Sequence, residues 1–268
     1  MSYDSQQRLV QTVDQMGRQV QLPYPPLRIV SLVPSQTELL FNLGLGEQVV
    51  GVTKFCVHPI EARQQKTVIG GTKQFDFEKI AALQPDLIIG NKEENYLQGI
   101  EQLAADFPVW MSDISSLPEA LGMVRDIGQL TGTAERAEQL VQDIASSFGA
   151  LPGAVETERV AYFIWRKPYM VAANGTFIND MLTRAGFTNV LAHLERYPEI
   201  TAEQLAAASP QRILLSSEPH PFGEKHRAEF QQICPAAKVE IVDGELFSWY
   251  GSRLLKSAAY FRQLCFAS

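Results

Sequence analysis

A helix-forming segment followed by a proline turn and a buried strand occurs twice in this sequence, once in each half. The first copy is 78–90 (EKIAALQPDLIIG) and the second is 203–215 (EQLAAASPQRILL). In both copies the proline lies seven positions after the first glutamate, and another glutamate lies eight positions after the proline. Open α/β sheets bind ligands outside the carboxyl ends of their strands, where the later glutamates fall. The repeat therefore predicts two similar α/β units, each with an acidic loop at its ligand-binding edge.

The pattern around both copies supports mainly parallel sheets. Short apolar runs bounded by turn residues alternate with helical periodicity, which is typical of parallel strands covered on both faces. The predicted strands are 28–33, 49–52, 87–89, 108–111, 159–164, 213–215 and 239–242, and the predicted helices include 35–45, 76–83, 176–184 and 201–208.

A helical connector separates the two halves. Residues 117–148 carry no strand signal, and Thr133 is a suitable cap for a helix that continues to about residue 150. Such a helix is about 27 Å long at 1.5 Å per residue, so we expect a rigid bridge. The predicted organisation is an N-terminal α/β lobe (1–115), a helical linker (116–155) and a C-terminal α/β lobe (156–268), with a ligand cleft between the lobes.

Composition excludes several classes of partner. The 268 residues carry a formal net charge of −7, which disfavours nucleic acid and anionic membrane surfaces. No apolar run approaches the roughly 20 residues of a membrane span, and the polar N-terminus shows no secretory signal. Three separated cysteines indicate no disulfide scaffold, and the redox states of Cys234 and Cys265 stay open.

Standard catalytic motifs are absent from the sequence. It contains no G-x-S-x-G, no H-E-x-x-H and no P-loop, and the Gly44-Leu45-Gly46 segment lacks the third glycine of a dinucleotide-binding fingerprint. We predict a binding protein that is not an enzyme. A metal-dependent enzyme that uses Cys56 and His58 is the less favoured alternative.

The first candidate ligand loop is 54–59, which follows a predicted strand. Cys56 and His58 are two positions apart and point the same way if the loop is extended. Three interpretations stay open for this pair: metal ligation, contact with an organic ligand, and structural packing.

Three further loops carry the remaining candidate ligand contacts. Lys92 and Glu93 follow the strand of the first repeat, and aromatic side chains beside cations follow the strand 159–164, as suits a flat or conjugated ligand. The last segment, 245–253, combines three aromatics with an arginine before the final helix, where backbone amides and Arg253 are expected to hold an anionic group. Solvated charges and packed aromatics are the alternative interpretation. The candidates in these loops are Lys92, Glu93, Trp165, Tyr169, Glu218, Phe222, Phe247, Trp249, Tyr250 and Arg253.

In order along the chain, five segments resemble one known family. They are 14–20 (DQMGRQV), 26–38 (PLRIVSLVPSQTE), 83–89 (LQPDLII), the helical linker and 186–190 (GFTNV). They are similar to the substrate-binding proteins of ABC importers for vitamin B12, iron siderophores and haem, in the helical-backbone metal receptor class. The resemblance covers residues 16–266. It implies two α/β lobes bridged by one long helix, and a small or medium organic ligand or metal chelate bound between them.

The same resemblance implies partners and a location. In cobalamin- and siderophore-binding members one glutamate on each lobe contacts arginines of the permease, and the matching positions are Glu78 and Glu203. A favourable charge in the first turn of a helix explains the same residues without docking. The resemblance further implies a periplasmic or extracytoplasmic monomer with no cofactor of its own, whose ligand carries any metal. An intracellular carrier or sensor of the same fold is the alternative.

Overall fold

The computed structural model describes residues 8–151 and 157–266. It divides into two compact units. The N-terminal unit contains Met1–Asp113, Glu119–Asp143 and Tyr250–Ser252, and the C-terminal unit contains Ile114–Pro118, Ile144–Trp249 and Arg253–Ser268. None of the helices in the described part of the chain is long and apolar enough to cross a membrane.

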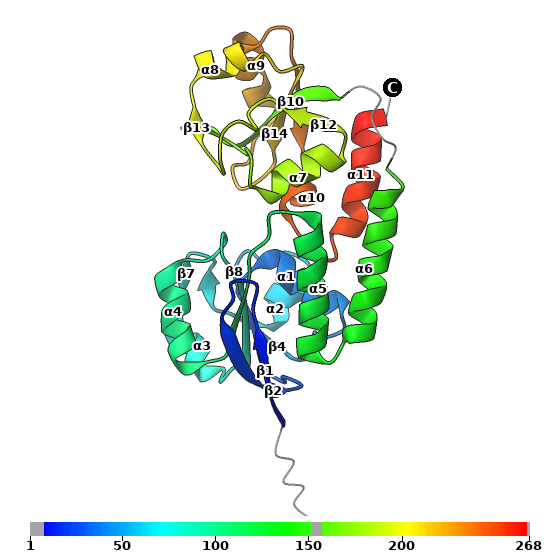
Figure 1. The fold of residues 1–268 in the computed structure, drawn as a ribbon. Helices are drawn as coiled ribbons and strands as arrows, with labels where there is room; N and C mark the ends of the chain where they lie inside the picture. The colour runs from blue at the N-terminus through cyan, green and yellow to red at the C-terminus, as the bar shows by residue number, and fades with distance from the viewer. Residues whose placement is uncertain (1–7, 152–156, 267–268) are drawn as a thin grey trace, which may run out of the picture. The chain divides into compact units, whose positions relative to one another are not determined.

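The N-terminal unit is built on a five-stranded parallel sheet in the order β5-β4-β3-β8-β9 (Figure 1). Buried aliphatic residues of the central strands pack against α3 and α4 and form the core of the unit. The strands are β3 (Ile29–Ser31), β4 (Val49–Val52), β5 (Thr67–Val68), β8 (Leu87–Asn91) and β9 (Val109–Ser112), and the helices between them are α1 (Pro34–Asn42), α2 (Ile60–Gln65), α3 (Phe77–Ala82) and α4 (Leu97–Asp106).

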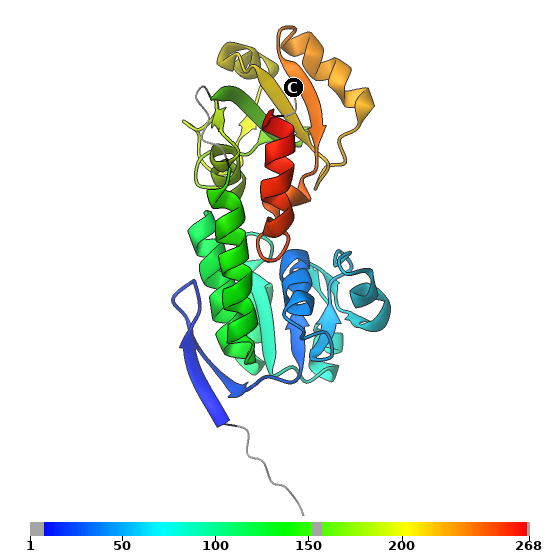
Figure 2. The same cartoon turned by 90° about the vertical axis from the view of Figure 1, so that its right-hand side faces the viewer.

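Two small antiparallel pairs and two longer helices complete this part of the chain. The pairs are β1 (Arg8–Val13) with β2 (Gln19–Tyr24), and β6 (Gly70–Gly71) with β7 (Gln74–Phe75). The helices α5 (Leu117–Thr131) and α6 (Ala134–Gly149) lie side by side (Figures 1 and 2), and Arg125 of α5 donates to Glu138 of α6 at 2.8 Å. Residues of α6 belong to both units.

The C-terminal unit contains a six-stranded mixed sheet. Its main order is β13-β11-β10-β14-β15, and β12 also pairs with β10. The β12–β10, β10–β14 and β14–β15 pairs are parallel, whereas the β10–β11 and β11–β13 pairs are antiparallel. The strands are β10 (Glu158–Trp165), β11 (Tyr169–Val171), β12 (Phe187–Asn189), β13 (Glu199–Ile200), β14 (Arg212–Ser216) and β15 (Lys238–Val242). The helices are α7 (Phe177–Arg184), α8 (Ala202–Ala208), α9 (Glu224–Ile233), α10 (Glu245–Ser248) and α11 (Leu254–Phe266). The prediction of an α/β fold with mainly parallel sheets is confirmed.

The repeated motif has the same local geometry in both units. Asp76 accepts a hydrogen bond from the third residue of α3, and Thr201 does the same for α8. The residues before the two prolines, Gln84 and Ser209, both have a left-handed backbone, with φ of 45° and 48°. This conformation ends each helix and directs the chain into β8 or β14. The motif is therefore one helix–turn–strand structure built twice.

Candidate functional site

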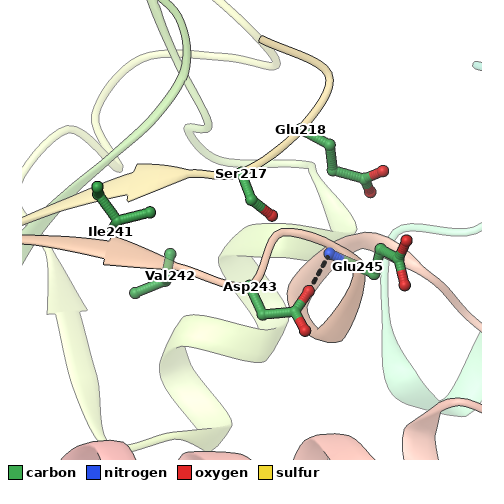
Figure 3. A pocket seen from close by; sticks show the side chains of 6 residues that line it. All are labelled: Ser217, Glu218, Ile241, Val242, Asp243 and Glu245. Carbon is green, nitrogen blue, oxygen red and sulfur yellow. Dashed lines mark hydrogen bonds between the residues drawn. The ribbon is translucent and has the colours of Figure 1, made fainter. Parts of the chain in front are cut away.

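A pocket opens at the carboxyl edge of the C-terminal sheet (Figure 3). Its volume is about 500 Å³, and it lies where β14 and β15 end. Figure 3 shows the carboxyl groups of Glu218 and Glu245 on one side of the pocket and the aliphatic side chains of Ile241 and Val242 on the other. The lining residues are Ser217, Glu218, Ile241, Val242, Asp243 and Glu245.

Short backbone contacts hold the two pocket loops together. The Ser217 amide donates to the Val242 carbonyl at 2.9 Å, and the Gly244 amide donates to the Ser217 hydroxyl at 3.0 Å. A β-carbon at Gly244 would lie 2.2 Å from the hydroxyl oxygen of Ser216, so only glycine allows this approach. The pocket wall is therefore a packed junction of two loops.

Glu218 connects the loop after β14 to the segment after α10. One of its carboxylate oxygens, Oε1, accepts from the Ser248 hydroxyl and from the Trp249 indole Nε1, both at 2.8 Å. Hydrogen bonds to an ionised acceptor are stronger than neutral ones. The carboxylate thus fixes the Trp249 ring at the side of the pocket.

Arg253 is buried and contacts two residues of its own unit. Its guanidinium pairs with Glu245 at 2.7 Å and lies 4.9 Å from the centroid of the Trp249 ring. Only 6% of Arg253 is exposed. In the structure the Arg253 charge is paired with a glutamate of the chain, and its expected contact with an anionic ligand group stays a prediction. The charged groups that line the pocket are Glu218, Asp243 and Glu245.

The other aromatic candidates differ sharply in exposure. Trp165 is 40% exposed, and its indole donates to the Lys167 carbonyl at 3.1 Å. Phe222 and Phe247 are buried in the C-terminal core. Tyr250 is also buried, and it belongs to the N-terminal unit. Of these aromatic side chains, Trp165 is the one that the surface of its unit presents to solvent.

Tyr169 is half-buried and donates its hydroxyl to Glu229 of α9. Burial, together with this carboxylate, raises the pKa of the Tyr169 phenol to about 12. Arg166 pairs with the same glutamate at 2.7 Å. The three side chains tie the turn after β10 to α9.

The candidate loop of the N-terminal unit places its thiol in the core. Cys56 is fully buried, with its Sγ 3.1 Å from the Thr37 hydroxyl and 3.3 Å from the Thr53 hydroxyl. Burial raises the pKa of this thiol, which is therefore protonated at neutral pH. His58 is half-buried. Among the described residues, no three histidine, cysteine or acidic side chains are grouped to hold a metal ion.

The loop after β8 is shaped by Asn91. Its side-chain oxygen accepts from the Glu93 amide at 2.9 Å, and its nitrogen donates to the Ser112 hydroxyl at 3.0 Å. Lys92 is exposed and pairs with Asp113 at 2.6 Å. Lys73 donates to the Glu93 carbonyl, so the loop is anchored from two sides.

Sequence reasoning missed Ser217, Asp243 and the supporting role of Asn91. A signal for Asp243 was present, because it directly follows the predicted strand 239–242 at the same carboxyl edge as Glu218. Extending the strand-end rule to this third strand would have identified it. Asn91 was visible only as a polar residue at the end of an apolar strand.

Both proposed docking glutamates are exposed. Glu78 and Glu203 are each the second residue of their helix, α3 and α8, directly after a capped start. Hydrogen bonds from the start of α8, with the Thr201 side chain first, lower the pKa of the Glu203 carboxyl. Each unit therefore presents one negative charge at an equivalent position.

Comparison with known proteins gives consistent matches along most of the chain. A family model described as periplasmic binding protein matches residues 29–236. The vitamin B12-binding protein of Pectobacterium carotovorum is 28% identical over 247 residues, covering 90% of this chain and 87% of that protein. An uncharacterized ABC transporter substrate-binding lipoprotein of Bacillus subtilis is 28% identical over 259 residues, covering 91% and 82%.

Solved structures share the fold. The periplasmic vitamin B12-binding protein of Vibrio cholerae superposes with a TM-score of 0.74 at 24% identity, covering 89% of this chain and 96% of that one. A periplasmic haem-binding protein of Roseiflexus superposes with a TM-score of 0.77 at 24% identity, covering 89% and 98%.

Proposed function

The chain belongs to the periplasmic binding protein family, and on that premise we propose that it captures a metal chelate of the corrinoid, haem or siderophore type and delivers it to an ABC importer. Relatives named as vitamin B12-binding proteins match about nine-tenths of the chain, which supports this ligand class. The observation that carries the transport role is the doubled motif, because it gives each unit the same exposed glutamate. By the same resemblance the protein works as a monomer outside the cytoplasm.

The ligand contacts in this proposal come from loops at the carboxyl edges of the two sheets. In the C-terminal unit they are the exposed Trp165 ring and the pocket residue Glu218, with Trp249 and Arg253 as the packed support behind the pocket. In the N-terminal unit they are the polar loop at Lys92 and Glu93. A metal, where the ligand has one, arrives inside the chelate.

Binding is tested by isothermal titration of the purified protein with cyanocobalamin, haemin and ferrichrome as probes. We expect one probe to bind, and Trp165→Ala to weaken its binding at least tenfold while the melting temperature changes little, because the ring is substantially exposed. The matched control is His193→Ala, which removes an exposed ring of the same unit. The ligand class is refuted if no probe binds, and the contact is refuted if Trp165→Ala binds like the wild type.

Docking is tested with the cognate permease in proteoliposomes. Glu78→Ala combined with Glu203→Ala is expected to abolish the stimulation of ATP hydrolysis while probe affinity stays unchanged. Glu135→Ala is the control, since Glu135 is also the exposed second residue of a helix, α6. Full stimulation by the double variant would contradict the docking role, and equal loss in the control would show a general charge effect.

A further inference from the structure

Two histidines of the C-terminal unit lie in one aromatic cluster. The cluster joins the pocket loop, defined as residues 217–222, to the helix α9. His220 belongs to this loop, and His226 lies in the first turn of α9. Their ring centroids are 5.5 Å apart. Phe222 lies against both, at 4.6 Å from His220 and 5.5 Å from His226, and Trp165 contacts His220 at 5.4 Å.

His226 holds the start of α9 through a ring nitrogen that carries no proton. The Gly223 amide donates to Nδ1 of His226 at 2.9 Å. An imidazole nitrogen accepts a hydrogen bond only in its unprotonated form, and both nitrogens of the cationic ring are donors. Protonation of Nδ1 therefore replaces this hydrogen bond by two donors that face each other. The contact exists only with neutral His226.

The surroundings of the two rings disfavour a positive charge. His226 is 95% buried, and burial, followed by the cations Lys225 and Arg166 and by His220, lowers its pKa. Burial lowers the pKa of His220 as well, with Arg166 and Lys225 adding to the effect. Among the described residues, the carboxylate that favours the cation at His226 is Glu229, which Arg166 already pairs at 2.7 Å.

His220 adds a second site that resists protonation. Its Nε2 atom is buried and has no hydrogen-bond partner among the described residues. An N–H⁺ group at this place would stay unsolvated unless the loop moved away from the cluster. The packed loop therefore favours the neutral form of both histidines, and protonation favours the open loop.

We propose that His220 and His226 form an acid-sensitive latch on the pocket loop: protonation releases Gly223 from His226 and opens residues 219–223 together with the first turn of α9. The opened segment directly follows Ser217 and Glu218, which line the pocket, so the state of the latch decides how firmly one wall of the pocket is held. A role of the latch in ligand release rests on the proposed function, whereas the latch itself is a property of the ligand-free protein.

The direction of the pH dependence follows from the depressed pKa values. The packed loop binds fewer protons than the open loop. In the open loop the histidines are solvated and are expected to titrate near the ordinary histidine value of about 6.5. The latch is thus intact above that pH and weakens as the pH falls below it. For each unit by which the pH falls below about 6.5, each histidine lowers the ratio of closed to open loop by up to about tenfold.

The test is amide hydrogen exchange at Gly223 in the ligand-free full chain, between about pH 5 and pH 7.5, with the intrinsic exchange rate divided out. The result is the ratio of open to closed loop at each pH. In the wild type we expect this ratio to rise by about tenfold or more from pH 7.5 to pH 5. In His226→Gln the rise is expected to shrink at least threefold, because glutamine at this capping position accepts the same amide bond without titrating. His193→Gln, at an exposed histidine, is expected to keep the wild-type profile.

The latch would be overturned if exchange at Gly223 were as acid-sensitive in His226→Gln as in the wild type. It would also be overturned if His193→Gln lost this acid sensitivity. If His226→Gln does not fold, NMR titration of the wild-type His226 ring decides. A midpoint clearly below 6.5 supports the latch, and a midpoint at or above 6.5 overturns it. Because these measurements contain no ligand, their failure is distinct from a failure of cyanocobalamin, haemin or ferrichrome to bind.

Discussion

Glu218→Ala is the substitution that most directly tests the construction of the pocket. It removes the acceptor of two hydrogen bonds, from Ser248 and from Trp249, both 2.8 Å long. The Trp249 ring is 8% exposed, so the loss of this acceptor falls on a buried indole N–H. Both bonds end on the same carboxylate oxygen, Oε1.

The size of the effect follows from these contacts. A hydrogen bond to a charged group contributes about 1.5–3 kcal/mol, and an unsatisfied buried donor costs about 1–3 kcal/mol. Because Glu218 and Ser248 are half-buried and water can replace part of the loss, we expect Glu218→Ala to lower the free energy of unfolding by about 2–4 kcal/mol. Glu218→Gln keeps an oxygen acceptor in place but loses the charge, so it should cost roughly half as much as Glu218→Ala.

The assay is urea unfolding of the ligand-free protein, followed by far-UV circular dichroism. Glu135→Ala, at an exposed glutamate, serves as the control and should stay within about 0.5 kcal/mol of the wild type. The reasoning is refuted if Glu218→Ala is as stable as this control. It is also refuted if Glu218→Gln is as damaging as Glu218→Ala, since the negative charge and not the acceptor geometry would then be decisive.

Two further predictions concern the N-terminal unit. Gly251 has φ of 105°, and a β-carbon there would lie 3.3 Å from the β-carbon of Leu39. Gly251→Ala should therefore lower the melting temperature, and it should lower the free energy of unfolding in urea by about 1–3 kcal/mol. The control is Gly149→Ala, at a glycine with open space around it, which should not lower the free energy of unfolding. The second prediction concerns the Cys56 thiol, which is buried and has a raised pKa. Iodoacetamide at about pH 8 should therefore label Cys56 at least a hundredfold more slowly in the native protein than in urea. Mass spectrometry of the Cys56 peptide measures the two rates. Rapid native labelling of Cys56 would contradict its burial.

Local signals in the sequence were sufficient for the repeated helix–turn–strand motif. Asp76 and Thr201 cap their helices because their side chains reach an amide three residues along the chain. The left-handed residues before Pro85 and Pro210 end the same helices within one turn. Short strands such as β13, with two residues, were not predicted because so few residues show no periodicity. Their pairing with a neighbouring strand defines them.

The candidate site was predicted as a set of loops but not as a set of exposed side chains. Trp165 and Trp249 are the same residue type in similar aromatic and basic contexts, yet one is 40% exposed and the other 8%. Trp249 meets Glu218, which lies 31 positions earlier in the chain and accepts from its indole, and its ring lies against Arg253. Cys56 likewise meets Thr37 of α1, 19 positions away, which no spacing rule connects to it.

The sequence by itself determined where α3 and α8 begin and end, that the central strands are buried and that the chain contains one helix–turn–strand structure twice, because each of these depends on neighbours within a few residues. The tertiary structure alone decided which charges are paired, which rings are covered and which loops share a pocket. Arg253 shows the reason: its charge could be read from the sequence, but whether a ligand or Glu245 neutralises it depends on how α10 and the start of α11 pack.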